Sequence, residues 1–381
     1  MKSTFLLATL ASLSNANYIR APAEYSDFRS FDVSVAVGNP PQQVDLWVDT
    51  GSSDTWVSDT SFNKGASASF VHSSVPVKAT YMDGMDWEGT KATERVSVAG
   101  SIVNNANIGV LKSIAERPPW YPPFHGYMGL SLEEGEQWTP RYPNLLSQMK
   151  SQGLIRRRAF GVYINGMKGE VLFGGYDQDR IKGKLRYVPL VNNRLRRIKN
   201  SPTPYEYDVL VTAIMRNNKD ILKRPGSRPR CVETYDALLD TGYTEFEAPQ
   251  HVINALAADF GAKPMNGELY ITKCNSAGAH NTYTFDFNGV PINVPGKAFL
   301  MPVEENSDTC RMLMRVHNKE NRMVLGLPFF RYVYVYFDAE AYQVGLAEQN
   351  PHASGRPQIV TGSPHTGSVC WMNVNGLEKC I

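Results

Sequence analysis

Two Asp-Thr-Gly tripeptides are the segments of this chain best suited to carry chemistry. They span Asp49 to Gly51 and Asp240 to Gly242, and each directly follows a run of apolar residues. A single tripeptide of this kind is a common turn, because Asp and Gly favour turns for local reasons. Two copies in the same setting are far more specific. If the two aspartates face each other, they share one proton, since like charges that close cannot both ionise.

A pair of carboxyl groups that holds one proton can act as a base and as an acid. The ionised member draws a proton from water, while the protonated member polarises a carbonyl group. This combination hydrolyses an amide without a metal ion and without a covalent intermediate. Gly51 and Gly242 let the backbone approach the pair closely. Thr50 and Thr241 supply short hydroxyls able to tie the two loops together.

Downstream of each Asp-Thr-Gly, the chain has a similar segment of two apolar residues and a glycine. The first half of the chain has Tyr127 to Leu130, and the second half has Val324 to Leu327. The separation from aspartate to glycine is 80 residues in the first half and 86 in the second. Because self-similarity of this kind reveals architecture, we predict two duplicated β lobes, each with one aspartate where a strand meets a turn.

Strand patterns dominate the rest of the chain. Residues 31–37, 44–48 and 332–337 alternate or are wholly apolar, which predicts strands. The best helical patterns are short and lie at 145–152 and 249–260. Thirty glycines and 24 prolines divide the chain into short pieces. We therefore predict an all-β protein.

Composition and the start of the chain bound the class of protein. A length of 381 residues with 42% hydrophobic content fits one large or two medium globular domains, and excludes disordered, collagen-like and coiled-coil proteins. The formal charge of +2 gives no reason to expect a nucleic acid or an anionic membrane as partner. Residues 1–16 have the basic start, apolar run and small residues of a secretory signal peptide. No other stretch is apolar enough to predict a membrane span.

The cysteines and histidines give no metal-site motif. All five cysteines lie at or beyond Cys231, and export makes disulfides expected. Pairing Cys274 with Cys310 and Cys370 with Cys380 would leave Cys231 over, but the sequence does not fix the connectivity. The seven histidines are scattered and no zinc-binding motif occurs. We therefore expect neither a metal ion nor an organic cofactor.

With these motifs in view, the sequence resembles the pepsin-like aspartic endopeptidases of the secreted fungal type, over nearly all of residues 27–349. The segment Asp49 to Val57, Asp-Thr-Gly-Ser-Ser-Asp-Thr-Trp-Val, is similar to the first catalytic motif of that family. Residues 171–177 resemble the strand and turn that enter the region between the lobes, and residues 324–347 resemble the closing strands of the second lobe. The resemblance implies that Asp49 and Asp240 are the catalytic pair.

A hairpin flap over the cleft is also implied by this resemblance. Ala79 to Gly84, Ala-Thr-Tyr-Met-Asp-Gly, resembles the flap of the family. Tyr81 would then be the flap tyrosine, with its hydroxyl near Trp56. The backbone near Gly84 would grip the substrate.

Further residues acquire roles only through the resemblance. The segment 124–130 resembles the one that lines the pocket before the scissile bond, which implicates Phe124 and Tyr127. Cys274 and Cys310 would form the disulfide of the second lobe. Residues around the two aspartates are expected to bind substrate or support the pair: Gly51, Gly242, Thr50, Ser52, Thr241 and Thr244. A bilobal fold is implied, with a central cleft, a first lobe at 17–190, a second at 191–349 and a tail at 350–381.

Three features depart from the family pattern. Tyr243 occupies a position where the family has Ser or Thr, whose hydroxyl bonds to the second aspartate. A tyrosine hydroxyl lies several ångströms farther out, so we expect the proton balance of the pair to change. Met82 replaces a flap glycine and narrows the backbone freedom of the hairpin tip. Asn17 lies only 32 residues before Asp49, so we expect no inhibitory pro-segment between the signal peptide and the first lobe.

These observations predict a secreted acid endopeptidase, extracellular or vacuolar, that acts as a monomer on peptide or protein substrates. The departures leave one alternative: a pepsin-like protein that has left proteolysis for small-molecule catalysis, binding or inhibition in the same cleft. A lectin or structural β protein would require the paired motifs to be a coincidence. Replacing Asp49 or Asp240 by Asn distinguishes a catalyst from a binding protein.

Overall fold

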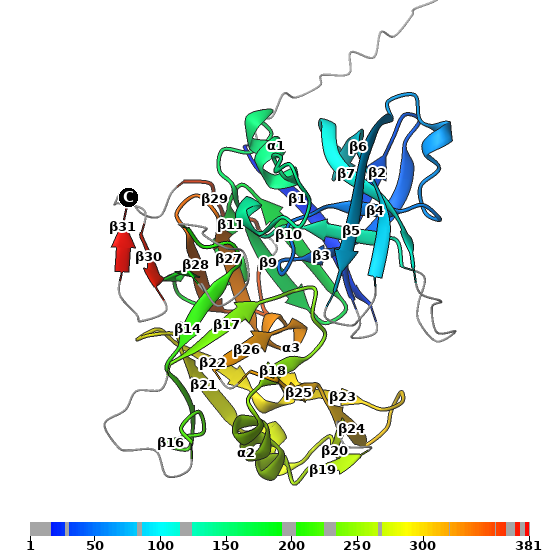
Figure 1. Ribbon diagram of the computed structural model, residues 1–381. Helices are drawn as coiled ribbons and strands as arrows, with labels where there is room; N and C mark the ends of the chain where they lie inside the picture. Colours follow the sequence, from blue (N-terminus) through cyan, green and yellow to red (C-terminus); the bar gives the residue numbers. More distant parts are fainter. Residues whose placement is uncertain are drawn as a thin grey trace, which may run out of the picture.

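The computed structural model in Figure 1 describes most of the chain. The described residues are 17–26, 30–81, 86–114, 124–192, 203–224, 234–265, 269–319, 321–354, 356–362, 370–373 and 378–380. The predicted signal peptide at 1–16 lies outside these residues, as do Met82, Gly84 and Cys231.

Within the described residues, one large sheet of thirteen strands forms the upper and central part of Figure 1. Its order is β12 (Arg186–Pro189), β28 (Gln343–Glu348), β27 (Val333–Asp338), β9 (Ala159–Asn165), β10 (Lys168–Phe173), β1 (Ile19–Ser26), β2 (Ser30–Val37), β3 (Gln42–Asp49), β8 (Gly126–Gly129), β4 (Trp56–Ser58), β7 (Ser101–Ser113), β6 (Asp86–Val98) and β5 (Val71–Thr80). Most neighbours are antiparallel, but β8 runs parallel to β3 and β7 runs parallel to β4.

Three smaller sheets build the lower lobe in Figure 1. The first has the order β14 (Asp208–Val211), β17 (Tyr235–Leu239), β26 (Arg322–Leu325), β18 (Phe246–Ala248) and β25 (Met314–Val316). The second is β16 (Lys219–Asp220), β15 (Ala213–Arg216), β21 (Thr282–Asp286) and β22 (Pro291–Pro295). The third is β19 (Lys263–Met265), β20 (Leu269–Lys273), β24 (Thr309–Met312) and β23 (Leu300–Pro302). The fold is therefore bilobal and all-β, as predicted.

The predicted local elements are confirmed to within one or two residues. Strands β2, β3 and β27 cover the three predicted strands. The predicted helices are α1 (Leu145–Ser151) and α2 (Gln250–Phe260). Helix α1 begins where the side chain of Asn144 accepts a hydrogen bond from the Ser147 amide at 3.0 Å. Helix α2 ends at Gly261, whose φ of 59° suits glycine. A third helix, α3 (Leu327–Phe330), was not predicted because it is a single turn.

Strands β27 and β28 lie in the large sheet and not with the other strands of the second half. Strand β27 pairs with β9, so that Val335 lies opposite Val162, and β28 pairs with β12. This differs from the expectation that residues 324–347 close the second lobe. The local pattern predicts that 332–337 is a strand, but it does not reveal a partner so distant in the sequence. Strands β27 and β28 thus join the sheet that carries the first lobe (Figure 1).

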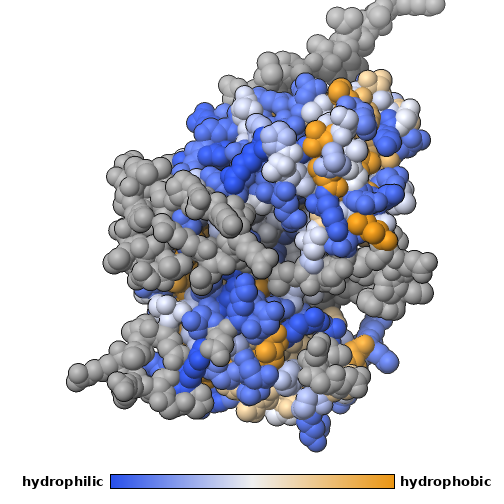
Figure 2. Space-filling view, viewed as in Figure 1, coloured by the Kyte–Doolittle hydropathy of each residue, from blue (hydrophilic) through white to orange (hydrophobic). Residues whose placement is uncertain are grey.

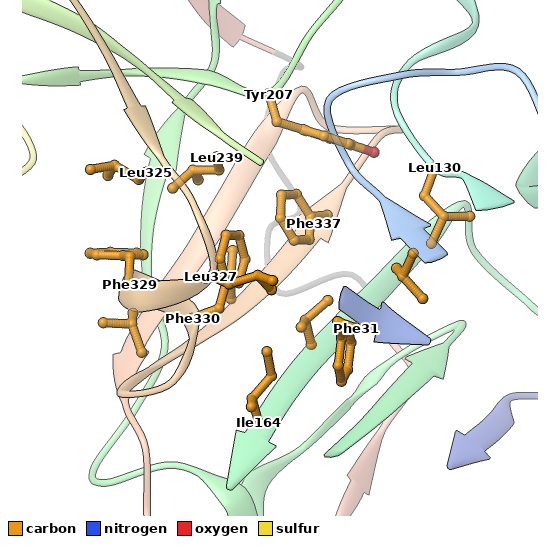
Figure 3. Close-up of a cluster of buried hydrophobic side chains, with 14 of the residues drawn as sticks. Phe31, Leu130, Ile164, Tyr207, Leu239, Leu325, Leu327, Phe329, Phe330 and Phe337 are labelled. Carbon is orange, nitrogen blue, oxygen red and sulfur yellow. The ribbon is translucent and has the colours of Figure 1, made fainter. Parts of the chain in front are cut away.

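One continuous hydrophobic core connects the two halves. Figure 3 shows Phe31, Leu130 and Ile164 from the first half beside Leu239, Leu325 and Phe337 from the second. Phe337 stacks on Phe160 of β9 and on Phe330 of α3, with ring centroids 4.8 and 6.2 Å apart. Burying such large apolar side chains removes much surface from water, which stabilises the junction of the lobes.

The tail also returns to the body of the protein. Strand β29 (Ile359–Val360) pairs with β11 (Tyr176–Asp177). Strand β30 (Cys370–Asn373) pairs with β13 (Val191–Asn192) and with β31 (Glu378–Cys380), which sets Cys370 opposite Cys380 in the backbone register. On the face in Figure 2, hydrophilic residues dominate and hydrophobic ones form small groups. None of the helices in the described part of the chain is long and apolar enough to cross a membrane.

Candidate active site

Parallel strand pairing places Asp49 at the end of β3. Its register partner on β8 is Gly129, and the Leu130 amide donates to the Asp49 carbonyl at 2.8 Å. A Cβ at Gly129 would lie 2.6 Å from the Asp54 amide nitrogen. The downstream glycine is therefore required because the loop after Asp49 packs directly on it.

The second lobe repeats this construction around Asp240. Strand β17 runs parallel to β26, with Leu239 opposite Leu325, and the Asp240 amide donates to the Leu325 carbonyl at 3.1 Å. A Cβ at Gly326 would overlap the Glu245 carbonyl oxygen. The downstream glycines Gly129 and Gly326 thus have the same structural role in the two lobes.

Two threonines cross between the lobes beneath the aspartates. The Thr50 hydroxyl donates to the Leu239 carbonyl at 2.7 Å and accepts from the Thr241 amide at 3.0 Å. The Thr241 hydroxyl donates to the Val48 carbonyl at 2.6 Å and accepts from the Thr50 amide at 3.2 Å. Both threonines are fully buried. The arrangement is nearly symmetric and holds the two loops against each other.

Each Asp-Thr-Gly glycine contacts the aspartate of the other lobe. A Cβ on Gly51 would lie 2.5 Å from Asp240 Oδ2, and one on Gly242 would overlap Asp49 Oδ1. Asp49 is 4% exposed and Asp240 is 7% exposed. The structure therefore brings the two predicted aspartates together, with no room for side chains between the loops.

The two carboxyl groups have different hydrogen-bond donors. Asp49 Oδ1 accepts from the Gly51 amide at 2.8 Å, and Asp49 Oδ2 accepts from the Ser52 hydroxyl. Asp240 Oδ1 accepts from the Gly242 amide at 2.8 Å. Donors stabilise the ionised form of a carboxyl group. Asp49 is thus better suited to carry the negative charge than Asp240.

Burial raises the pKa of both carboxyl groups, and the charge of Asp49 adds to the rise at Asp240. Burial raises the pKa of Asp49, while the hydrogen bonds from Ser52 and Gly51 oppose that rise. Burial and then the charge of Asp49 hold the pKa of Asp240 well above its ordinary value. These effects favour protonation of Asp240 over protonation of Asp49.

The hydroxyl of Tyr243 is directed away from Asp240. It donates to Glu247 Oε1, four residues farther along the chain. Thr244 is half-buried, and within the described residues its side chain forms no hydrogen bond with Asp240. The expected change in proton balance thus has a geometric basis, because Asp240 lacks the hydroxyl that Ser52 provides to Asp49.

Aromatic side chains form one wall beside the aspartates. The Trp56 indole Nε1 donates to the Tyr81 hydroxyl at 2.6 Å. The Tyr81 ring lies 4.6 Å from the Tyr127 ring, and Phe124 lies 5.6 Å from Trp56, measured between centroids. The structure therefore brings together the aromatic residues that the resemblance implicated. Phe124 and Tyr127 are 8% and 5% exposed, so these rings largely fill the space between them.

Several residues at the site were not identified from the sequence. The Trp47 Nε1 donates to the Thr241 carbonyl at 2.9 Å, which adds another bond between the lobes. Asp54 is buried and accepts from the Tyr142 hydroxyl at 2.5 Å and from the Gln137 amide at 2.9 Å. Asp54 and Glu245 each follow an aspartate of the pair by five residues. This repetition was a usable signal, because it extends the internal repeat beyond Asp-Thr-Gly.

The remaining predictions concern metal ions and disulfides. In the described ranges, no group of three or more His, Cys, Asp or Glu residues is arranged to hold a metal ion. Cys274 and Cys310 form a disulfide, with their Cα atoms 4.9 Å apart. It links β24 to the residue after β20 at the outer edge of the second lobe.

The geometry and the relatives of the chain agree on its class. Two β lobes that set two buried aspartates face to face over crossed threonines define a pepsin-like protein. A family profile for eukaryotic aspartyl proteases matches residues 30–349. The chain therefore belongs to the eukaryotic aspartyl protease family, and it is an aspartic-type endopeptidase.

Individual relatives share about a quarter of their residues with this chain. An acid protease of Saccharomycopsis fibuligera is 28% identical over 85% of this chain and 82% of its own length. Barrierpepsin of Saccharomyces cerevisiae is 24% identical over 97% of this chain and 69% of its own length. Candidapepsin-1 of Candida albicans is 26% identical over 84% of this chain and 81% of its own length.

Proposed function

We propose that the protein is a secreted acid endopeptidase in which Asp49 and Asp240 activate a water molecule against a peptide bond. The observation that carries this proposal is the reciprocal contact of the two loops, in which each glycine abuts the other lobe's aspartate. Such contact forces the carboxyl groups to share a proton, which is the state that general acid and base catalysis requires.

The unequal donors of the pair support an assignment of roles. Asp49, with the Ser52 hydroxyl and the Gly51 amide as donors, carries the negative charge and takes a proton from water. Asp240 holds the shared proton and donates a hydrogen bond to the substrate carbonyl. The water then attacks the carbonyl carbon, and the proton on Asp240 passes to the developing oxyanion. When the C–N bond breaks, the leaving amine takes its proton from Asp49, and a hydroxyl of the diol returns a proton to Asp240 as the product carboxyl group forms.

The aromatic wall supports a preference for bulky apolar side chains in the substrate. Trp56, Phe124 and Tyr127 meet beside the aspartates, and burying an apolar side chain against them contributes about 1.5–3 kcal/mol. Tyr81 directly follows strand β5, so its hydrogen bond with Trp56 links the wall to the hairpin proposed as the flap. Gly84 of that hairpin lies outside the described residues; we retain it as the proposed grip on the substrate backbone.

Cleavage of a mixed peptide library from acidic to neutral pH tests this function. The purified mature chain is compared with Asp49→Asn and Asp240→Asn, each with and without a statine-type transition-state analogue. We expect cleavage between apolar residues that both substitutions and the analogue abolish. A folded wild-type protein that cleaves no peptide at any pH contradicts the proposal, and so does undiminished cleavage by either variant.

Destination and oligomeric state form a separate part of the proposal. The predicted signal peptide at 1–16 supports export, and a relative from Candida albicans is named secreted aspartic protease 1. Delivery to the medium, and not to a vacuole, predicts activity in the culture supernatant of producing cells. We further propose that the protein acts as a monomer, for which size-exclusion chromatography with light scattering is the test.

A further inference from the structure

Trp47 connects the first lobe to the loop that carries Asp240. It lies on β3 two residues before Asp49, so the alternation of the strand directs both side chains to the same face of the sheet. Its indole Nε1 donates to the Thr241 carbonyl at 2.9 Å. This hydrogen bond joins a side chain of one lobe to the backbone beside the aspartate of the other lobe.

The Thr241 carbonyl belongs to the same peptide group as the Gly242 amide, and that amide donates to Asp240 Oδ1 at 2.8 Å. Because a peptide group is planar, fixing its carbonyl oxygen also fixes the direction of its N–H. A hydrogen bond to the carbonyl also polarises the peptide group, so the N–H becomes a stronger donor. The bond from Trp47 therefore orients and strengthens the backbone donor of Asp240.

The second lobe has no equivalent of this side chain. Leu238 occupies the corresponding position, two residues before Asp240 on β17. A leucine side chain has no group that donates a hydrogen bond, so Leu238 cannot hold a peptide group of the first loop in this way. Trp47 therefore acts on one aspartate of the pair and not on the other.

Packing fixes the indole ring in this position. The Trp47 ring lies 5.5 Å from the Tyr127 ring and 6.3 Å from the Phe124 ring, measured between centroids. Tyr127 is also the register partner of Trp47 on β8. Because both neighbouring rings are buried in the aromatic wall, the indole has little freedom to turn its N–H away from Thr241.

We propose that Trp47 is a positioning residue of the aspartate pair, whose indole N–H holds the Thr241–Gly242 peptide group so that the Gly242 amide remains on Asp240. The inference rests on the proposed function and adds a residue that determines its rate. The Tyr243 hydroxyl is directed elsewhere, so this amide has the larger share in fixing the Asp240 carboxyl group.

The kinetics of Trp47→Phe test the proposal, because phenylalanine keeps an aromatic ring but lacks the N–H. A misaligned Asp240 slows the chemical step, so we expect kcat to fall about 10-fold while KM changes less than about twofold. Trp138→Phe is the matched control. It removes an indole N–H from the same aromatic cluster, but this N–H donates at 3.1 Å to the Lys78 carbonyl of β5 and not to an Asp-Thr-Gly segment. We expect its kcat to fall less than about twofold.

The Gly242 amide signal in NMR separates failure of this inference from failure of the proposed function. Labelling threonine with ¹³C at the carbonyl and glycine with ¹⁵N selects one amide signal for each of the four Thr-Gly sequences of the chain. Thr241→Ser identifies the Gly242 signal by its loss. In Trp47→Phe we expect this signal to move upfield as the bond to Asp240 weakens, while the Gly51 signal stays in place. This result supports the inference even if no peptide is cleaved.

Trp47→His is the rescue variant, and it keeps the test decisive if Trp47→Phe does not fold. Its five-membered ring places an Nε2–H where the indole has its Nε1–H, so we expect the Gly242 signal to stay near its wild-type position. The proposal is overturned if this signal does not move in Trp47→Phe or if it moves upfield in Trp47→His. A fall in kcat no larger than that of Trp138→Phe also overturns it.

Discussion

Residues 49–56 and 240–247 form the same loop twice, but with different side-chain partners. Three residues after the aspartate, the first loop has Ser52, whose hydroxyl donates to Asp49. The second loop has Tyr243, whose hydroxyl donates to Glu247 instead. The backbone amides are equivalent in the two loops, so this position is where the aspartates become unequal.

Five residues after the aspartate, both loops bury an acid. Asp54 is held by a tyrosine hydroxyl and a backbone amide. Glu245 pairs with Arg311 and with Arg315, the latter at 3.1 Å. The first lobe therefore satisfies its acid with neutral donors, and the second lobe uses positive charges.

Seven residues after the aspartate, the loops differ again. Trp56 donates a hydrogen bond to Tyr81, outside the first loop. Glu247 instead accepts a hydrogen bond from Tyr243, within the second loop, and lies 3.8 Å from His317. The comparison teaches that a duplicated backbone supplies symmetric positions for the aspartates. The side chains around them then stabilise negative charge on Asp49 more than on Asp240.

The glycines offer the strongest way to break the symmetry. Gly51→Ala would drive a methyl group into Asp240, and Gly242→Ala would drive one into Asp49. We expect each variant to lose at least about 100-fold in kcat/KM, because a displaced carboxyl group no longer reaches its reacting atom. Gly65→Ala is the control, since its Cβ would meet only Asn63 at 3.4 Å. Near wild-type activity in Gly51→Ala would contradict this account of the pair.

The crossed threonines test whether the two halves of the junction are equivalent. Thr50→Val and Thr241→Val each leave a buried amide and a buried carbonyl without their hydrogen-bond partner. We expect each to lower the free energy of unfolding by about 2–4 kcal/mol, measured by urea denaturation. Thr50→Ser and Thr241→Ser keep the hydroxyl and should recover most of the loss. A large difference between the two valine variants would show that the junction is not symmetric.

The buried acid Glu136 should make the stability of the protein depend on pH. Burial raises the pKa of Glu136 from 4.5 to about 8, so the folded protein keeps this group protonated. Its contribution to stability is full below pH 4.5 and is lost as the pH rises toward 8. Glu136→Gln should therefore increase the free energy of unfolding at pH 8 by about 1–3 kcal/mol, with no change at pH 4.

Glu245→Gln is the matched variant in the second lobe. It removes a buried partner of Arg311 and Arg315, so it should decrease the free energy of unfolding at pH 8. An increased free energy of unfolding in both variants at pH 8 would contradict the distinction between neutral and charged partners.

The smallest expected effect concerns Tyr243. Tyr243→Thr should supply a hydroxyl to Asp240, lower its pKa and move the upper pH limit of cleavage down by about half a unit. Tyr243→Phe should leave that limit unchanged, since the native hydroxyl serves Glu247. A limit that moves in the phenylalanine variant would show that the Tyr243 hydroxyl acts on Asp240 after all.

Much of the fold and of the candidate site could be predicted, because short sequence patterns determine it and the patterns around the aspartates occur twice. The two Asp-Thr-Gly segments, their downstream glycines and the short helices α1 and α2 all follow from patterns of a few residues. The direction of the Tyr243 hydroxyl could be anticipated in part, because a tyrosine side chain is too long to replace Ser or Thr.

The rest depends on contacts between distant parts of the chain. The sequence shows Arg322, Glu206 and Asp208 as separate charged residues, and only strand pairing makes them one group. The pairing of β27 with β9 is likewise a contact between distant residues, because 173 residues separate Val162 from Val335. Short-range periodicity carries no information about such pairings.

The position of β27 has a consequence for how the protein is made. The strand lies between β9 and β28, so the large sheet is interrupted until residues 333–348 have been synthesised. Pairing across such long separations closes large loops, which slows folding. During synthesis, the first lobe must wait with the β9 edge uncovered while the second lobe emerges from the ribosome. Correct assembly of both aspartate loops is therefore a late event, because it requires residues 333–348 to be present.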